Sequence, residues 1–224
     1  MKTFKQFLSE SHQFEIERFK TDCALFLEQL KGSHGSALLY RGSAFPPTDW
    51  DIREWERRTK PRDTLRVYHD AMNEWYKDRM GDEVRNWMFC TGSAPRAQPY
   101  AGWTGKPISV IFPIGHVEWV CSRDPELTDM TDYIANLEHE VQKDLAAGIE
   151  DEDQGEDQDA IETETIKRLT NKLSSTKFWR STNLLDCIHS QIEIMFKCDK
   201  YYCFADVKGG TLYSPEMQQL LKSL

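Results

Sequence analysis

Short apolar runs along the chain predict its strands. Between Ser190 and Cys198, apolar residues at 192, 194 and 196 alternate with Gln191, Glu193, Met195 and Lys197, which is typical of a strand with one face on a core. A second run, 201–205, follows after only two polar residues, so the pair predicts a tight hairpin. Similar runs predict further strands at 37–41, 86–91, 108–115 and 117–121.

Apolar residues at helical spacing predict longer elements between these strands. The pattern indicates helices at 14–30, 65–80, 127–147 and 160–173, with a shorter one at 183–189. Glycines at 32, 81 and 148 end three of them. Ser214 followed by Pro215 predicts a C-terminal helical turn, because proline is favoured at the first helical position.

Length and cysteine usage narrow the class of protein. The 224 residues suffice for one sizeable domain, and no run of eighteen apolar residues predicts a membrane span. The N-terminal residues lack the apolar stretch and cleavage site of a secretory signal. The six cysteines never occur as Cys-x-x-Cys, so we expect reduced, mostly buried thiols in a cytosolic protein and no zinc site.

The net charge of −9 comes from one segment. Residues 150–164 contain nine carboxylates and no lysine or arginine, and the rest of the chain carries 28 basic and 28 acidic residues. We therefore expect a nearly neutral body with an acidic insert near 149–165, which is a solvated loop leading into a helix. Mimicry of nucleic acid, or a patch for a basic partner, is the alternative interpretation.

Three positions could carry chemistry, although each also has a purely structural interpretation. Gln191 and Glu193 project from the same side of their predicted strand, where a rigid backbone would hold an amide beside a carboxylate. Arg41 ends another strand and would suit an anionic ligand or a structural ion pair. The arginine-rich segment 50–63 is either a phosphate-contacting loop or a surface of mixed charge.

In their order along the chain, three of these segments resemble the Arg–Ser/Thr–Glu pattern of mono-ADP-ribosyltransferases. Residues 39–42 (Leu-Tyr-Arg-Gly) look like the aromatic-Arg strand of that family, and 89–93 (Phe-Cys-Thr-Gly-Ser) look like a degenerate form of its Ser-Thr-Ser strand. Residues 191–195 look like its Gln/Glu-x-Glu strand. The resemblance covers roughly 36–207. It implies an α+β fold with mixed, mostly antiparallel sheets and flanking helices, in one domain spanning 11–224.

The resemblance also implies roles for individual residues, with NAD as the substrate. Glu193 would stabilise positive charge on the ribose, Thr91 would orient Glu193, and Gln191 would position the acceptor. Arg41 would hold the NAD pyrophosphate. Gly42, Thr91 and Ser93 would also contact NAD. The acceptor would be a host protein or nucleic acid, no metal would be needed, and glutamine at 191 goes in that family with acceptors other than arginine.

The first ten residues resemble the capsid-targeting peptide of internal head proteins of T-even-type phages. In those proteins cleavage follows Leu/Ile-x-Glu, which here means after Glu10. This implies a protein packaged in the phage head that acts in the host cytoplasm. An ordinary N-terminal helix is the alternative. Two other functions are open: a non-catalytic internal protein that inhibits a host defence or nucleic-acid enzyme, and a DNA- or RNA-modifying transferase that binds phosphates through 53–62.

Overall fold

A single antiparallel sheet organises the molecule. The computed structural model describes residues 14–43, 45–58, 64–101, 107–122, 124–127, 130–147, 157–180, 184–189 and 193–224. Within these residues eight strands pair in the order β2-β8-β4-β1-β3-β7-β5-β6, and every pairing is antiparallel. The strands are β1 (Leu39–Arg41), β2 (Trp50–Glu54), β3 (Met88–Thr91), β4 (Ser109–Ile114), β5 (Glu118–Ser122), β6 (Phe178–Arg180), β7 (Glu193–Lys197) and β8 (Lys200–Ala205).

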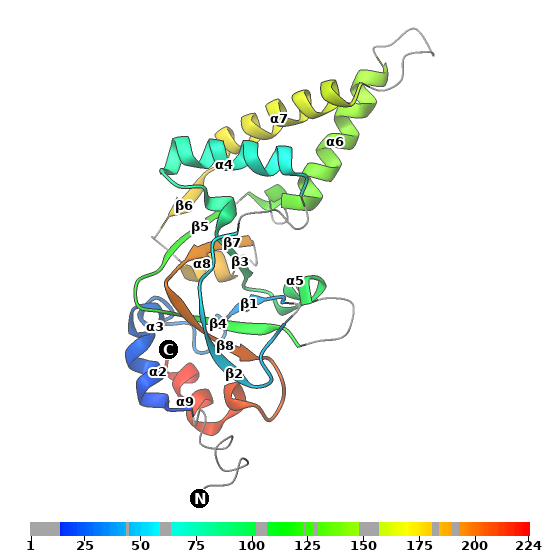
Figure 1. Cartoon of the computed structure of the whole chain (residues 1–224). Coiled ribbons are helices and arrows are strands. Elements are labelled where there is room, and N and C mark those ends of the chain that lie inside the picture. Colours follow the sequence, from blue (N-terminus) through cyan, green and yellow to red (C-terminus); the bar gives the residue numbers. More distant parts are fainter. Residues whose placement is uncertain are drawn as a thin grey trace, which may run out of the picture.

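Helices cover the sheet at both ends (Figure 1). At one end lie α2 (Ile16–Asp22), α3 (Ala24–Gln29) and α9 (Pro215–Ser223). At the other end lie α4 (Arg66–Met80), α6 (Met130–Ala147) and α7 (Gln158–Ser175), and α6 and α7 extend beyond the sheet as a helical arm. The short helices are α5 (Ala94–Ala97), α8 (Leu184–His189), η1 (Val84–Asn86), η2 (Gln98–Ala101), η3 (Pro125–Leu127) and η4 (Thr211–Tyr213).

Two hydrophobic clusters fix these layers. Aromatic rings dominate the first: Phe19 of α2 meets Phe112 and Phe204 edge-on, with ring centroids 5.1 and 5.8 Å apart. Edge-to-face packing of this kind adds to the stabilisation that burial itself provides. In the second cluster the apolar stripes of α4, α6 and α7 pack on Val120 and Met195 of the sheet. The sheet therefore carries one helical layer at each of these two clusters.

Most predicted elements are confirmed with small shifts of their ends, four features differ from the expectations, and strand β6 was not expected. The predicted helix 14–30 is broken at Cys23 into α2 and α3. Residues 50–54, which were expected in a loop, form edge strand β2 against β8. Strand β7 is covered on both faces, because Ile194 belongs to the first cluster and Met195 to the second. The described strands form one continuous sheet rather than several.

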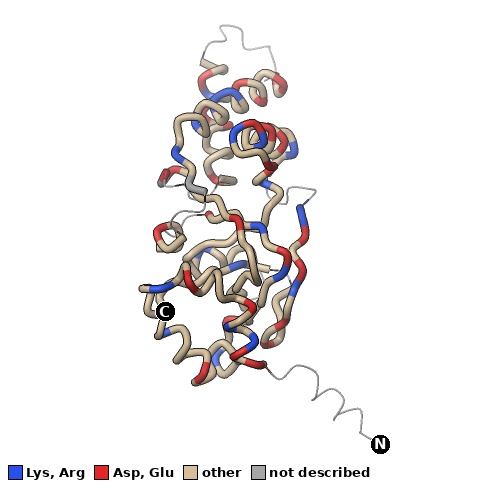
Figure 2. The backbone as a smooth tube through the Cα atoms, turned by 90° about the vertical axis from the view of Figure 1, so that its left-hand side faces the viewer, with Lys and Arg blue, Asp and Glu red and all other residues tan. Residues whose placement is uncertain are grey.

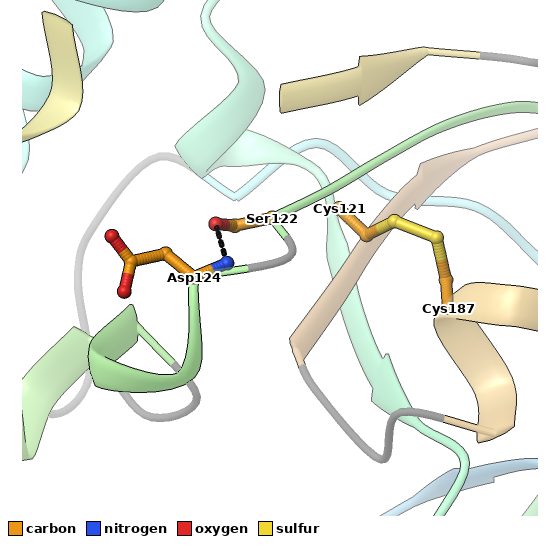
Figure 3. Close-up of a disulfide and its surroundings, with 4 residues drawn as sticks. All are labelled: Cys121, Ser122, Asp124 and Cys187. Atoms are coloured by element: carbon orange, nitrogen blue, oxygen red, sulfur yellow. Dashed lines mark hydrogen bonds between the residues drawn. A yellow bond between two sulfur atoms is a disulfide. The ribbon is translucent and has the colours of Figure 1, made fainter. Parts of the chain in front are cut away.

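The cysteine prediction is wrong for one pair. Cys121 of β5 and Cys187 of α8 form a disulfide that ties this helix to the sheet (Figure 3). The other four cysteines, at 23, 90, 198 and 203, are free and buried, as expected. The spacing of cysteines could not reveal the pair, because its members are 66 residues apart and meet only when α8 packs on β5.

Charges are distributed as the sequence predicts for the body. Basic and acidic positions are interspersed over the sheet and the helical arm (Figure 2). The second half of the acidic segment begins α7, whose first turn is capped by the Asp157 carboxylate accepting from the Asp159 and Ala160 amides. Residues 148–156 lie outside the described part of the chain. None of the described helices is long and apolar enough to cross a bilayer.

Candidate functional site

The strand register brings three distant segments into one row. Tyr40 of β1 pairs with Thr91 of β3, and Thr91 pairs with Glu193 of β7. Directly paired residues of antiparallel strands project from the same face. Tyr40, Thr91 and Glu193 therefore lie side by side on one face of the sheet, although more than a hundred residues separate the first from the last.

The Glu193 carboxylate is held by an arginine that sequence reasoning missed. Arg85 Nη1 donates to Glu193 Oε1 at 2.5 Å, and the two side chains are 7% and 20% exposed. Arg85 belongs to η1, which directly precedes β3. A single arginine in a short connecting segment gave no pattern to detect, and only the packing of η1 against β7 directs its side chain toward the carboxylate.

A second arginine lies close to Arg85, on the same aromatic ring of Phe89. The guanidinium of Arg85 lies 4.4 Å from the centre of the Phe89 ring, and that of Arg58 lies 4.6 Å from it. Phe89 is two residues before Thr91, so it occupies the same face of β3. The two cations, the aromatic ring and Glu193 form what we call the Arg58–Arg85 cluster.

A buried amide–imidazole network supports this cluster. His69 Nε2 lies 2.9 Å from Asn86 Oδ1, and Asn73 Nδ2 donates to the same oxygen at 3.2 Å. An amide oxygen only accepts, so Nε2 carries the imidazole proton. Burial lowers the pKa of His69, and the positive charges of Arg85 and Arg58 lower it further, so the ring is neutral at pH 7. His69 thus holds the η1 segment in place.

Two glycines allow neighbouring helices to approach the ends of these strands. A Cβ on Gly92 would lie 1.8 Å from the Ile188 carbonyl oxygen of α8, and one on Gly42 would lie 2.3 Å from the Ala97 carbonyl oxygen of α5. Between them the Thr91 hydroxyl accepts from the Ser93 amide at 3.2 Å, and both residues are buried. The motif residues at 91–93 therefore form a tight turn from β3 into α5.

Arg41 lies near this row but enters from the other side of its strand. It follows Tyr40 at the end of β1, so by strand alternation its side chain leaves on the opposite face. Its Nη1 donates to the Phe89 carbonyl oxygen at 3.4 Å. Burial raises the pKa of Tyr201 to about 12, and the nearby Arg41 charge opposes that rise. The structure thus brings Thr91 and Glu193 together and places Arg41 across β3 from them.

Some predicted site residues cannot be placed. Gln191 lies outside the described residues, as does the N-terminal segment 1–10. Among the described residues, no group of three His, Cys, Asp or Glu side chains is arranged to hold a metal ion.

Comparisons with known proteins add no family or relative. No protein-family model, curated protein or solved structure matches this chain.

Proposed function

We propose that this protein is an NAD-dependent mono-ADP-ribosyltransferase whose reacting centre is the row Tyr40–Thr91–Glu193. The observation that carries the proposal is the register: the three segments that resemble the family's motifs are neighbouring strands, and two of their polar side chains are directly paired. Chance occurrences of three short motifs would have no reason to meet in this way.

Glu193 has the chemistry that this reaction needs. Cleavage of the nicotinamide–ribose bond develops positive charge on the ribose, as in glycoside hydrolysis. A carboxylate fixed beside that carbon stabilises the charge and accepts a hydrogen bond from a ribose hydroxyl. The bond from Arg85 to Oε1 fixes the orientation of the carboxylate, and Thr91 lies directly beside it.

The phosphates of NAD would be bound by an arginine beside this row. Arg41 remains our assigned anchor for the pyrophosphate and would reach the ligand around the end of β1, and Gly42 is assigned to the same contact. Thr91 and Ser93 would contact the nicotinamide ribose from the turn after β3. Gln191 would position the acceptor, which is a host protein or nucleic acid.

The test uses purified protein, NAD labelled in the adenylate half, and host lysate. We expect label in a macromolecular fraction and a loss of about a hundredfold or more in rate for Glu193→Gln, which keeps the shape of the side chain but removes its charge. Arg41→Gln should raise KM for NAD more than it lowers kcat. Wild-type rates in Glu193→Gln would overturn the proposal.

The N-terminal peptide suggests where the enzyme acts. We propose that residues 1–10 direct the chain into a phage head and are removed there by cleavage after Glu10, so that the mature enzyme is delivered into the host cytoplasm. Mass spectrometry of purified virions should then find a protein beginning at Ser11. A virion protein that retains Met1 to Glu10 would contradict this step.

One observation favours a second candidate, a non-catalytic inhibitor of a host enzyme. The helical arm of α6 and α7 extends away from the sheet, and the acidic segment connects its two helices. Such an arm could present carboxylates to a basic partner. Deleting residues 150–156 separates the two functions, because an enzyme keeps NAD turnover whereas an acidic inhibitor loses its partner.

A further inference from the structure

A small hollow lies between the start of α4 and one side of α6, in the helical arm rather than in the row on the sheet. It encloses about 310 Å³ including its open mouth. Leu65 and Ile134 give it apolar walls. The hydroxyls of Thr64 and Thr131, which lie 3.4 Å apart, and the Glu138 carboxylate give it polar ones.

Glu138 lacks a cation although it is partly buried. Its Oε1 accepts from the Tyr68 hydroxyl at 3.0 Å, and no lysine, arginine or histidine of the described chain lies within ion-pair distance. A carboxylate withdrawn from water is costly unless it is paired. Other carboxylates of this protein with similar exposure, such as Asp82 and Asp124, are each paired with a lysine. Glu138 is therefore a partly buried carboxylate whose partner among the described residues is a hydroxyl, and its oxygens can accept further hydrogen bonds from a cation.

The charges on the surrounding elements make the hollow negative. Burial raises the pKa of Tyr68 to about 12, and Glu138 and Glu162 of the facing helices raise it too, so Tyr68 remains a hydrogen-bond donor. Arg66 is the arginine nearest in sequence to the lining residues Leu65 and Tyr68. Its side chain is 81% exposed and pairs with Asp70. A cation entering the hollow would meet the Glu138 carboxylate of α6, and Glu162 of α7 adds negative charge near Tyr68.

We propose that this hollow binds a short alkylammonium ion, either a free amine or the side chain of a lysine. The ammonium group has three donors, which match the Glu138 carboxylate and the two threonine hydroxyls. A stem of a few carbons would lie against Leu65 and Ile134. This site is independent of any activity toward NAD.

The test compares n-butylammonium with n-butanol, which has the same stem and no charge. Titration of isotope-labelled protein, followed by the amide signals of Ile134 and Ala135, should give saturable binding of the amine with an affinity in the millimolar range. The alcohol should bind at least about tenfold more weakly, because a polar site left unpaired rejects an analogue that lacks the matching group.

Variants connect this binding to Glu138. Glu138→Gln keeps an oxygen for Tyr68 and should weaken amine binding about tenfold, whereas Glu140→Gln, at an exposed position of the same helix, should not. Equal binding of amine and alcohol, no saturation by the amine, or an unchanged affinity in Glu138→Gln would overturn the proposal. Comparing Nα-acetyl-lysine amide with 1,4-diaminobutane then shows which source of the ammonium the hollow prefers.

Discussion

The Arg85–Glu193 pair should behave as a buried, coupled unit whose two members cannot be removed independently. The perturbations are Arg85→Met, Glu193→Gln and the double variant. Arg85→Met removes the ion pair at 2.5 Å and the contact at 4.4 Å with the Phe89 ring, while methionine fills much of the same space. It removes the Arg85 charge from a carboxylate that is only 20% exposed.

The magnitude follows from this burial. Breaking a fully buried ion pair by removing one partner costs about 3–5 kcal/mol. Glu193 retains some contact with water, which lowers the estimate, and the lost cation–π contact adds about 0.5–1 kcal/mol. We therefore expect Arg85→Met to lower the free energy of unfolding by about 3 kcal/mol. The double variant leaves no buried charge, so its cost should be at least about 1 kcal/mol less than the sum of the single costs.

Urea unfolding of the four proteins, followed by tryptophan fluorescence, measures these values. If the free energy of unfolding falls with urea concentration at the same slope in all four proteins, the substitutions have changed only stability. Additivity within about 0.5 kcal/mol would refute the coupling. A loss below about 1 kcal/mol for Arg85→Met would show that the pair is solvated and does not fix Glu193.

Three further predictions concern other contacts. Gly92→Ala should destabilise the protein by about 2 kcal/mol or more, measured by thermal unfolding, because the new Cβ would meet backbone of α8 at 1.8 Å. Replacing Cys121 and Cys187 together by serine should lower the free energy of unfolding by about 4 kcal/mol, the chain-entropy value for a 66-residue loop. The pKa of Asp82 is lowered: burial is the largest single influence and opposes this, but the hydrogen bonds from Lys197, the Glu83 amide and Trp87 and the Lys197 charge together outweigh it. Its contribution to stability should be complete above the unfolded pKa of about 3.9 and be lost as the pH falls through the lower folded value.

Each of these has its own control. The control for Gly92→Ala is Gly210→Ala. The backbone φ of Gly210 is negative, and a Cβ there would contact only side-chain atoms and one carbonyl oxygen, all at 2.9 Å or more, so this substitution should destabilise the protein less. A wild-type protein that a thiol reductant does not destabilise would contradict the disulfide prediction. For Asp82, the gap in stability between wild type and Asp82→Asn should narrow from pH 7 to pH 3, and a constant gap would contradict the proposed sign.

Local patterns predicted elements well where one rule dominated. The continuous apolar run 201–205 required only a buried strand, the helical stripes of 65–80 and 160–173 required only burial of one face, and these elements form nearly as expected. Strand β2 was missed because its residues are mixed in charge and only its pairing with β8 makes it a strand. The break at Cys23 was missed because the apolar stripe continues through both α2 and α3.

The site was accessible to sequence reasoning only in part. Thr91 and Glu193 were found because each lies in a short local motif. In the structure they are directly paired on neighbouring strands. Arg85, Arg58 and the His69 network were missed because their contacts depend on how η1 and α4 pack, and no spacing rule describes that packing. A shift of one residue along β1 would move the Arg41 side chain to the other face of the sheet. The motif did not specify which face it occupies.

The most direct measurement is the rate of ADP-ribose transfer from NAD by Glu193→Gln beside Glu118→Gln. Glu118 lies on the neighbouring strand β5, on the same face of the sheet, and pairs with Lys197 instead of the Arg58–Arg85 cluster. We predict that Glu193→Gln loses about a hundredfold or more while Glu118→Gln stays near wild type. Equal rates in the two variants, or no transfer by folded wild-type protein, would contradict a reacting centre at the row Tyr40–Thr91–Glu193.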